Sequence, residues 1–212
     1  MNILHLTFSS RGELSESRKL SKKIVDMLIR LNPNAELIAR GLGDGTLPHI
    51  DAEYASMQHS NDAGQAGTGS SARSDQLIAE LERADVIVIG TPMHNLSAPS
   101  SLKAWIDHVV RARRTFTMTS AGKKGMLHDR PVYIAVASGG RFSGANAHQP
   151  DFLTSYLKTI LASIGLCDVR FFTIEGTGGR AESVEVSRRI ANQELTRHFK
   201  SLGLKHACEN LD

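Results

Sequence analysis

Apolar residues form two kinds of pattern along the chain: short continuous runs, and longer stretches in which they recur every three or four positions. The short runs predict strands at residues 3–8, 35–42, 85–91, 131–137 and 168–175. In the third and fourth runs the apolar residues are consecutive instead of alternating. This is typical of strands that are covered on both faces.

The longer stretches predict amphipathic helices. Residues 17–31, for example, place Leu20, Ile24 and Leu28 on one helical face. The same spacing predicts further helices at residues 51–59, 74–83, 100–111, 152–164 and 182–202.

Two polar segments interrupt this alternation. Residues 60–71, "SNDAGQAGTGSS", are small and polar and bury too little apolar area to offset their ordering entropy, so we expect a mobile loop inside the domain. Residues 112–129 form a polar excursion for which the pattern predicts neither helix nor strand.

The alternation of strands and helices predicts a mainly parallel sheet with helices on both faces, because parallel neighbours need long right-handed crossovers. The predicted fold is therefore α/β, a three-layer α/β/α sandwich in one domain spanning residues 1–212. For five parallel strands we favour the flavodoxin-like order 2-1-3-4-5, whose switch point lies between strands 1 and 3. Ligands bind beyond the carboxyl ends of strands at such a point, so we expect the loops after strands 1, 3 and 4 to meet there.

Composition narrows the classes of function. The 25 Lys and Arg against 22 Asp and Glu give a net charge of only +3 without a basic stripe, so we expect no nucleic-acid partner. Cys167 and Cys208 are the two cysteines, and no His or Cys spacing predicts a metal site. The sequence begins without a signal-peptide pattern and contains no run long enough to cross a membrane, so we expect a soluble cytoplasmic protein.

The loop after the first predicted strand, "SSRGELSESRKLS", contains neither GxGxxG nor GxxxxGKS. It offers the hydroxyls of Ser9, Ser15 and Ser17 where the next helix begins, and the free amides of a helix start favour a phosphate. Arg11 and Arg18 add positive charge. The alternative is that Ser15 only caps the helix, as serines at helix starts usually do.

The third strand leads into "TPMHN", residues 91–95. Pro92 has no amide hydrogen, and we expect it to end the strand pairing. Met93 can lie against a flat ring, and Asn95 carries both a donor and an acceptor. A planar heteroaromatic ligand with a polar edge fits this set, although a plain turn after the strand explains it as well.

After the fourth strand comes "SGGRFSG", residues 138–144, whose consecutive glycines let the backbone approach a ligand closely. Such glycines are equally common in ordinary turns. None of the three loops is specific alone, and their significance depends on their meeting at one edge.

The order and spacing of these segments resemble the FMN-dependent NADH-azoreductase and quinone reductase family over nearly the whole chain. The resemblance rests on "SSRGELSESRKL", "TPMHNLSAPSSLKAWIDHVVRARRTF", the Ser-Gly-Gly stretch and "YLKTILASIGLCDVRFF". It implies a flavodoxin-like fold and a homodimer with FMN at the subunit interface. It also implies a ping-pong reaction in which NADH or NADPH reduces FMN and the reduced FMN then reduces a quinone or azo compound. The flavin carries this chemistry, so the family implies no obligatory catalytic side chain.

Residue by residue, the resemblance implies three groups that bind FMN. The phosphate segment matches Ser9, Ser15, Glu16 and Ser17. The segments beside the flavin ring match Met93, His94, Asn95 and Leu96, and Ser138, Gly139, Gly140 and Arg141. Phe116 matches a phenylalanine on the substrate side, where it would contact the acceptor. For His94 the hypothesis is a contact with the acceptor or the flavin edge, and the alternative is a histidine that only fills space.

The chain departs from the family pattern at several of these positions. His94 replaces Tyr and Leu96 replaces Phe, which removes aromatic surface and introduces an imidazole, a group that in general titrates near neutral pH. Glu16 replaces Gln, and its charge would repel a phosphate unless it points away. Arg141 has moved from the second to the fourth place of its motif. A further departure is the set Arg113, Arg114 and Met118, which stands where the family has a Gly-rich aromatic entry.

Other functions remain open at this point. A flavodoxin-type electron carrier or an NAD(P)H:FMN reductase would use the same fold, and a phosphate-sensing module would use it without redox chemistry. Carriers tend to be shorter and strongly acidic, whereas this chain is slightly basic and spends residues 99–129 on an extended element. The sequence specifies neither the natural acceptor nor NADH against NADPH.

Overall fold

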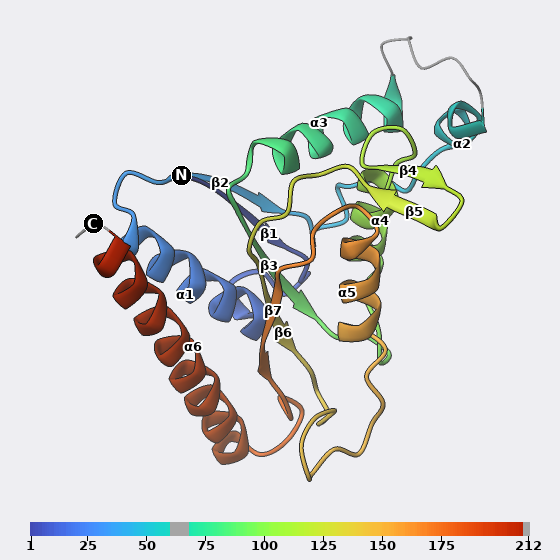
Figure 1. The fold of residues 1–212 in the computed structure, drawn as a ribbon. Helices are drawn as coiled ribbons and strands as arrows, with labels where there is room; N and C mark the ends of the chain where they lie inside the picture. Colours follow the sequence, from blue (N-terminus) through green and yellow to red (C-terminus); the bar gives the residue numbers. More distant parts are fainter. Residues whose placement is uncertain (60–67, 210–212) are drawn as a thin grey trace.

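The computed structural model describes residues 1–59 and 68–209 and contains a five-stranded parallel sheet at its centre (Figure 1). Its strands follow the order β2-β1-β3-β6-β7, which is the predicted order 2-1-3-4-5 once a separate hairpin is set aside. Their bounds are β1 Asn2–Thr7, β2 Glu36–Gly41, β3 Val86–Pro92, β6 Val132–Ala137 and β7 Val169–Ile174.

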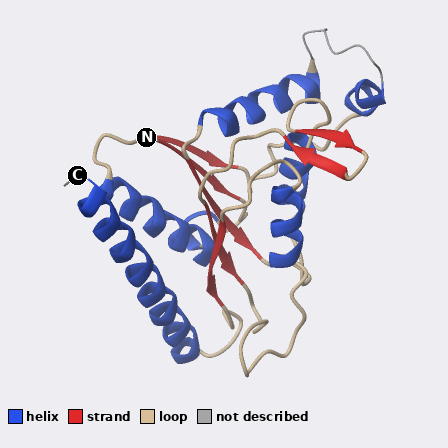
Figure 2. Ribbon diagram, in the orientation of Figure 1, coloured by secondary structure: helices blue, strands red, loops and turns tan. Residues whose placement is uncertain are grey.

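Helices cover both faces of the sheet and complete the three layers (Figure 2). One face carries α1 (Glu16–Leu31) and α6 (Ala181–Glu209). The other carries α3 (Gly69–Arg83), α4 (Ser100–Val109) and α5 (Thr154–Ala162). Two shorter helices are α2 (Ala52–His59) and the single 3-10 turn η1 (Gly12–Leu14).

Alternate residues of the inner strands enter two cores. Leu4, Ile87 and Ile134 pack with Trp105 against α3, α4 and α5, while Val88 and its neighbours pack against α1 and α6. In β3, each residue up to Thr91 is buried, which explains why its apolar residues are consecutive. The edge strand β2 is mostly exposed and carries charged residues, which protect an open edge from pairing with another chain.

The polar excursion contains an antiparallel hairpin that the sequence pattern did not predict. It consists of β4 (Phe116–Thr119) and β5 (Gly122–Gly125), which turn through Gly122 at a φ of 106°. The second strand, "GKKG", has no alternation and two glycines, so it carries no strand signal.

The structure also moves several predicted boundaries. The prediction of a mobile loop over residues 60–71 is wrong at its carboxyl end, because α3 begins at Gly69 and Ser70 and Ser71 are buried. Residues 60–67 of the predicted loop lie outside the described residues. The amide of Ser70 donates to Oδ2 of Asp51, which fixes this helix start. α5 begins at Thr154, later than predicted, and at this start Oδ1 of Asp151 accepts the amides of Leu153 and Thr154. α4 ends at Val109, and α6 continues to Glu209.

Within residues 1–59 and 68–209, none of the helices combines the length and the apolar character needed to span a bilayer.

Candidate functional site

The carboxyl ends of β1, β3 and β6 lie side by side at one edge of the sheet and are joined directly (Figure 1). The amide of Phe8, just after β1, donates to the carbonyl of Gly90 at 2.9 Å. The amide of Met93, just after β3, donates to the carbonyl of Ala137 at 2.8 Å. The loops that carry the predicted site residues therefore leave the sheet from neighbouring positions.

Pro92 does not end the strand pairing as predicted. It lies opposite Ala137 in the register of β3 and β6, and the pairing continues to the amide of Met93. Because the amides of Ile87 and Met93 face β6, the position of Pro92 faces the other side, where β1 has already ended. The missing amide of proline therefore removes no ladder hydrogen bond.

The start of α1 brings two serine hydroxyls together. Ser15 is the N-cap, and its Oγ accepts the amide of Arg18 at 3.3 Å and lies 3.0 Å from Oγ of Ser17. Both serines are buried. Ser9 lies half-buried upstream, where its Oγ accepts the amide of Arg11. Ser15 is thus a cap, and the amides of residues 16 and 17, like those of any first helical turn, have no acceptor within the helix.

The carboxylate of Glu16 is bound by residues of two helices. Arg188 of α6 donates from Nε and Nη2 to its two oxygens at 2.8 and 2.9 Å, and Lys19 lies 3.3 Å from Oε1. The hydrogen bond from Arg188 is the largest cause that lowers the pKa of Glu16 below its usual value. The negative charge of Glu16 is therefore paired with Arg188, which lies 172 positions away along the chain. No local sequence pattern predicts a pair of such separation.

The turn after β3 is strained. His94 and Ser97 exchange backbone hydrogen bonds at 3.0 and 2.9 Å, which leaves Asn95 and Leu96 as the two central residues of a tight turn. Both have positive φ, 48° and 68°, as in a type I′ turn. Asn tolerates this conformation, whereas Leu rarely adopts it, and such strain tends to concentrate at functional sites. His94 and Asn95 are exposed at this edge.

Behind this turn, the ends of β3 and β6 are linked through side chains. Ser138 is buried, and its Oγ accepts Nε2 of Gln149 at 3.0 Å and lies 3.7 Å from Sδ of Met93. Gln149 also lies 3.3 Å from the same sulfur. The structure therefore brings Met93 and Ser138 together, and it adds Gln149, which sequence reasoning missed because a lone polar residue in a long loop carries no pattern.

The two glycines after Ser138 have different surroundings. A Cβ added at Gly140 would lie 2.1 Å from Oε1 of Gln149, so glycine is the residue that fits there without a shift. A Cβ added at Gly139 would meet nothing within 4 Å, so the backbone there borders open space. Gly139 thus offers a backbone surface that a ligand can approach.

Glu175, at the end of β7, holds the next part of this loop. Its buried carboxylate accepts the amides of Phe142 and Ser143 at 2.8 and 3.1 Å and the hydroxyl of Ser143 at 2.5 Å. Arg141 lies against Gly176, and its carbonyl accepts amides from the far end of the loop. Glu175 is a second residue that the sequence analysis did not select.

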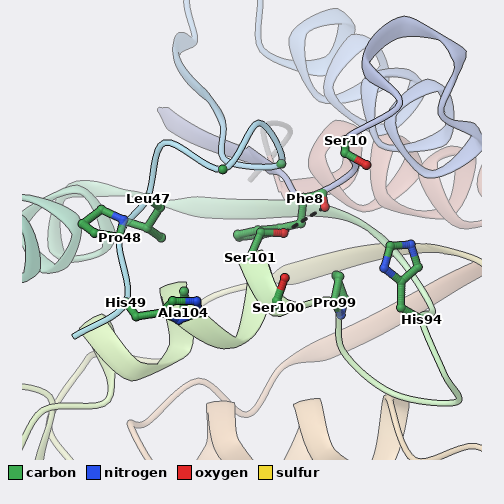
Figure 3. Close-up of a pocket in the computed structure, with 12 residues that line it drawn as sticks. Phe8, Ser10, Leu47, Pro48, His49, His94, Pro99, Ser100, Ser101 and Ala104 are labelled. Carbon is green, nitrogen blue, oxygen red and sulfur yellow. Dashed lines mark hydrogen bonds between the residues drawn. The ribbon is translucent and has the colours of Figure 1, made fainter. Parts of the chain in front are cut away.

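A cavity of about 250 Å³ opens between the end of β1, the loop after β2 and the start of α4 (Figure 3). Of the predicted site residues, His94 lines it, and Figure 3 shows His94 next to Pro99 at one side of the lining, with Leu47, Pro48 and His49 at the other. The wall beside α4 is fixed by Ser101, whose hydroxyl donates to the carbonyl of Phe8 at 3.0 Å. This cavity places His94 at the boundary between the strand ends and solvent.

Phe116 lies apart from these loops in sequence and is covered by the hairpin. It is 7% exposed, and the ammonium of Lys123 lies 4.4 Å from its ring centroid. Met118, two residues later, is 66% exposed. A contact between Phe116 and an acceptor stays a prediction.

Comparison with known proteins places this chain in a family. The model of the flavodoxin-like fold family matches residues 1–199. The FMN-dependent NADH:quinone oxidoreductase 5 of Burkholderia lata is 42% identical over 188 residues, which cover 88% of this chain and 91% of that protein. The FMN-dependent NADH:quinone oxidoreductase 4 of Pseudomonas fluorescens is 40% identical over 195 residues, which cover 92% of this chain and 94% of that protein.

Solved structures agree in fold. A crystal structure of an azoreductase from Bacillus anthracis matches with a TM-score of 0.83 at 22% identity, covering 95% of this chain and 99% of that one. An FMN-dependent NADH-azoreductase from the same species, solved in complex with FMN, matches with a TM-score of 0.76 at 24% identity, covering 94% and 100%. At these identities the structures support the fold, while the sequence relatives establish the family. The chain belongs to the flavodoxin-like family of FMN-dependent NADH:quinone oxidoreductases.

Proposed function

We propose that the protein binds FMN at the joined ends of β1, β3 and β6 and uses it to transfer reducing equivalents from NADH to quinone and azo acceptors. The relatives named above carry this activity in their names, which is one line of support. The observation that carries the proposal is the direct hydrogen bonding between the three strand ends, since it brings the phosphate, ring and backbone segments to one edge.

The residues present at this edge fit FMN. A phosphate needs donors without a competing anion, and the start of α1 supplies the hydroxyls of Ser15 and Ser17, first-turn amides, and a Glu16 carboxylate that Arg188 already binds. Ser9 is half-buried just after β1 and would complete this set. We assign the phosphate to these residues.

The flavin ring would be bordered by the turn of residues 93–96 and by residues 138–141. Met93 and Ser138 form its packed base, and the open backbone at Gly139 leaves room for close approach. When bound, FMN supplies the hydride chemistry itself. The role of the protein is to hold and orient the ring. The tight turn at Asn95 and Leu96, whose two residues have positive φ, is suited to this role.

On the proposed acceptor side, this chain departs from the family pattern in several side chains. The exposed His94 borders the cavity beside α4, and we propose that it contacts the acceptor or the flavin edge. We propose the same contact for Phe116, whose ring the hairpin covers and would have to expose. NADH is the proposed donor, as the names of the relatives state for those proteins.

We further propose that residues 1–212 form a single domain that acts as a homodimer in the cytoplasm. Large apolar side chains are exposed beside the proposed site, with Leu14 at 68% and Phe152 at 58%. Leu14 lies in the loop after β1, and the amide of Phe152 donates to the carbonyl of Leu96. Exposed apolar residues beside a binding site are suited to contact with a second copy.

The test is a visible spectrum of the purified protein with FMN, followed by NADH without oxygen and then by a quinone. We expect bleaching of the flavin band by NADH and its return on adding the quinone, with steady turnover in air-free assays. A protein that binds FMN but gives no NADH-dependent turnover would be an electron carrier, and one that stays colourless with FMN would refute the proposal.

A further inference from the structure

The start of α1 carries a carboxylate where the proposed FMN phosphate would bind. Glu16 is the first residue of the helix, between the paired hydroxyls of Ser15 and Ser17. The partial positive charge of a helix N-terminus attracts a carboxylate as it attracts a phosphate. An unpaired Glu16 would therefore compete for the same amides and would repel the phosphate.

Arg188 occupies both oxygens of this carboxylate. Its Nε and Nη2 donate to Oε2 and Oε1 at 2.8 and 2.9 Å in a bidentate pair, the strongest geometry for these groups. The Glu16 side chain is 13% exposed, so the pair is partly shielded from solvent. Lys19 also reaches Oε1, at 3.3 Å, but its side chain is half-exposed and its stem is flexible, so it is the weaker partner.

We propose that Arg188 is a positioning residue for the cofactor phosphate: by holding Glu16 against α6, it keeps the first turn of α1 available for the phosphate. The inference rests on the proposed function and deepens it. Arg188 itself acts through Glu16 and needs no contact with FMN. The lowered pKa of Glu16 agrees with this, since the pair keeps the carboxylate ionised and held.

The test is a double-mutant cycle read by flavin binding to the full-length apoprotein. FMN and riboflavin are titrated by fluorescence quenching against the original protein, Arg188→Met, Glu16→Gln and the double variant. We expect Arg188→Met to bind FMN about tenfold more weakly, because it leaves an unpaired anion at the helix start. In the Glu16→Gln background, which has no anion at the helix start, adding Arg188→Met should weaken FMN binding by no more than about threefold.

Riboflavin, which has no phosphate, separates this role from a structural one. Its affinity should be equal in all four proteins, and the effect on FMN should shrink as salt is raised. Arg188 also connects α6 to α1, but the double variant loses that connection as fully as Arg188→Met does. The exposed neighbour Arg189→Met is the matched control, with thermal unfolding to confirm that each variant is folded.

Three results would overturn the inference: an Arg188→Met variant with unchanged FMN affinity, an equal loss in the single and double variants, or a parallel loss for riboflavin. Failure of the proposed function looks different. In that case the original protein binds neither FMN nor riboflavin, whereas a protein that binds FMN with no response to Arg188 keeps its function and loses only this inference.

Discussion

Gly140 and Gln149 lie against each other within the loop after β6. We predict that the effects of substituting these two residues on the free energy of unfolding are strongly non-additive. A Cβ added at Gly140 would lie 2.1 Å from Oε1 and 2.8 Å from Cδ of Gln149. Atoms cannot remain that close, so Gly140→Ala must displace the Gln149 amide. That amide donates to Oγ of Ser138 at 3.0 Å and lies 3.3 Å from Sδ of Met93.

The cost follows from those two contacts. A neutral hydrogen bond contributes about 1 kcal/mol, and a buried hydroxyl that loses its donor adds to the loss, so Gly140→Ala should cost about 1–2 kcal/mol of folding free energy. Gln149→Ala removes the same contacts and should cost a similar amount. In the double variant the added methyl group enters space that Gln149 has vacated, so the second substitution should add less than about 0.5 kcal/mol.

Urea unfolding of the apoprotein, followed by far-UV circular dichroism, measures all three variants. Gly139→Ala is the matched control, because its Cβ would meet nothing within 4 Å and should change stability by less than about 0.5 kcal/mol. A double variant whose cost is the sum of the two single costs would refute the steric coupling, as would a neutral Gly140→Ala.

Three further predictions follow from buried or exposed polar groups. Arg40→Met removes the donor of both hydrogen bonds to the 2%-exposed Glu80 and should cost about 2 kcal/mol in urea unfolding, while a double variant that also carries Glu80→Met should regain most of it. Burial lowers the pKa of His5 from 6.5 to about 4, so the unfolded chain binds the proton more tightly; stability should fall by about 3 kcal/mol from pH 6.5 to 4, and His5→Gln should flatten that window. His94→Tyr and His94→Ala should shift the preference among quinone and azo acceptors, measured as ratios of kcat/KM, and unchanged ratios in both would rule out a role for this side chain.

The strands β3 and β6 were predictable because they are buried on both faces and almost wholly apolar. The strand order was predictable from the alternation of strands and helices, which favours this arrangement for five parallel strands. The helices were predictable for a similar reason, since α1 alternates buried and exposed residues at helical spacing. The hairpin at residues 116–125 was not predictable, because its strands have only four residues each and β5 consists of Gly and Lys alone. Such strands form through pairing with each other and carry no periodic signal. Pro92 was misread because its effect depends on which neighbour its missing amide faces, which only the register determines.

Within the site, sequence indicated the residues that lie on the three loops and missed those that hold the loops in place. Arg188, Gln149 and Glu175 each act on a segment that is distant in sequence or separated by a long loop, and each is a common polar residue without a motif. Such residues can be identified only from their contacts, which are known only once the fold is known.

The departures from the family pattern fall into two physical kinds. At Glu16 and Leu96 the replacement of the side chain is compensated by other contacts. The charge of Glu16 is paired with Arg188, and the turn that contains Leu96 is held by backbone hydrogen bonds between His94 and Ser97. His94 and Met118, by contrast, have exposed side chains. We therefore expect this chain to keep the cofactor binding of its family and to differ in the acceptors it accommodates, because the residues proposed to hold FMN depend on backbone hydrogen bonds and a paired charge, whereas His94, proposed to contact the acceptor, has an exposed side chain.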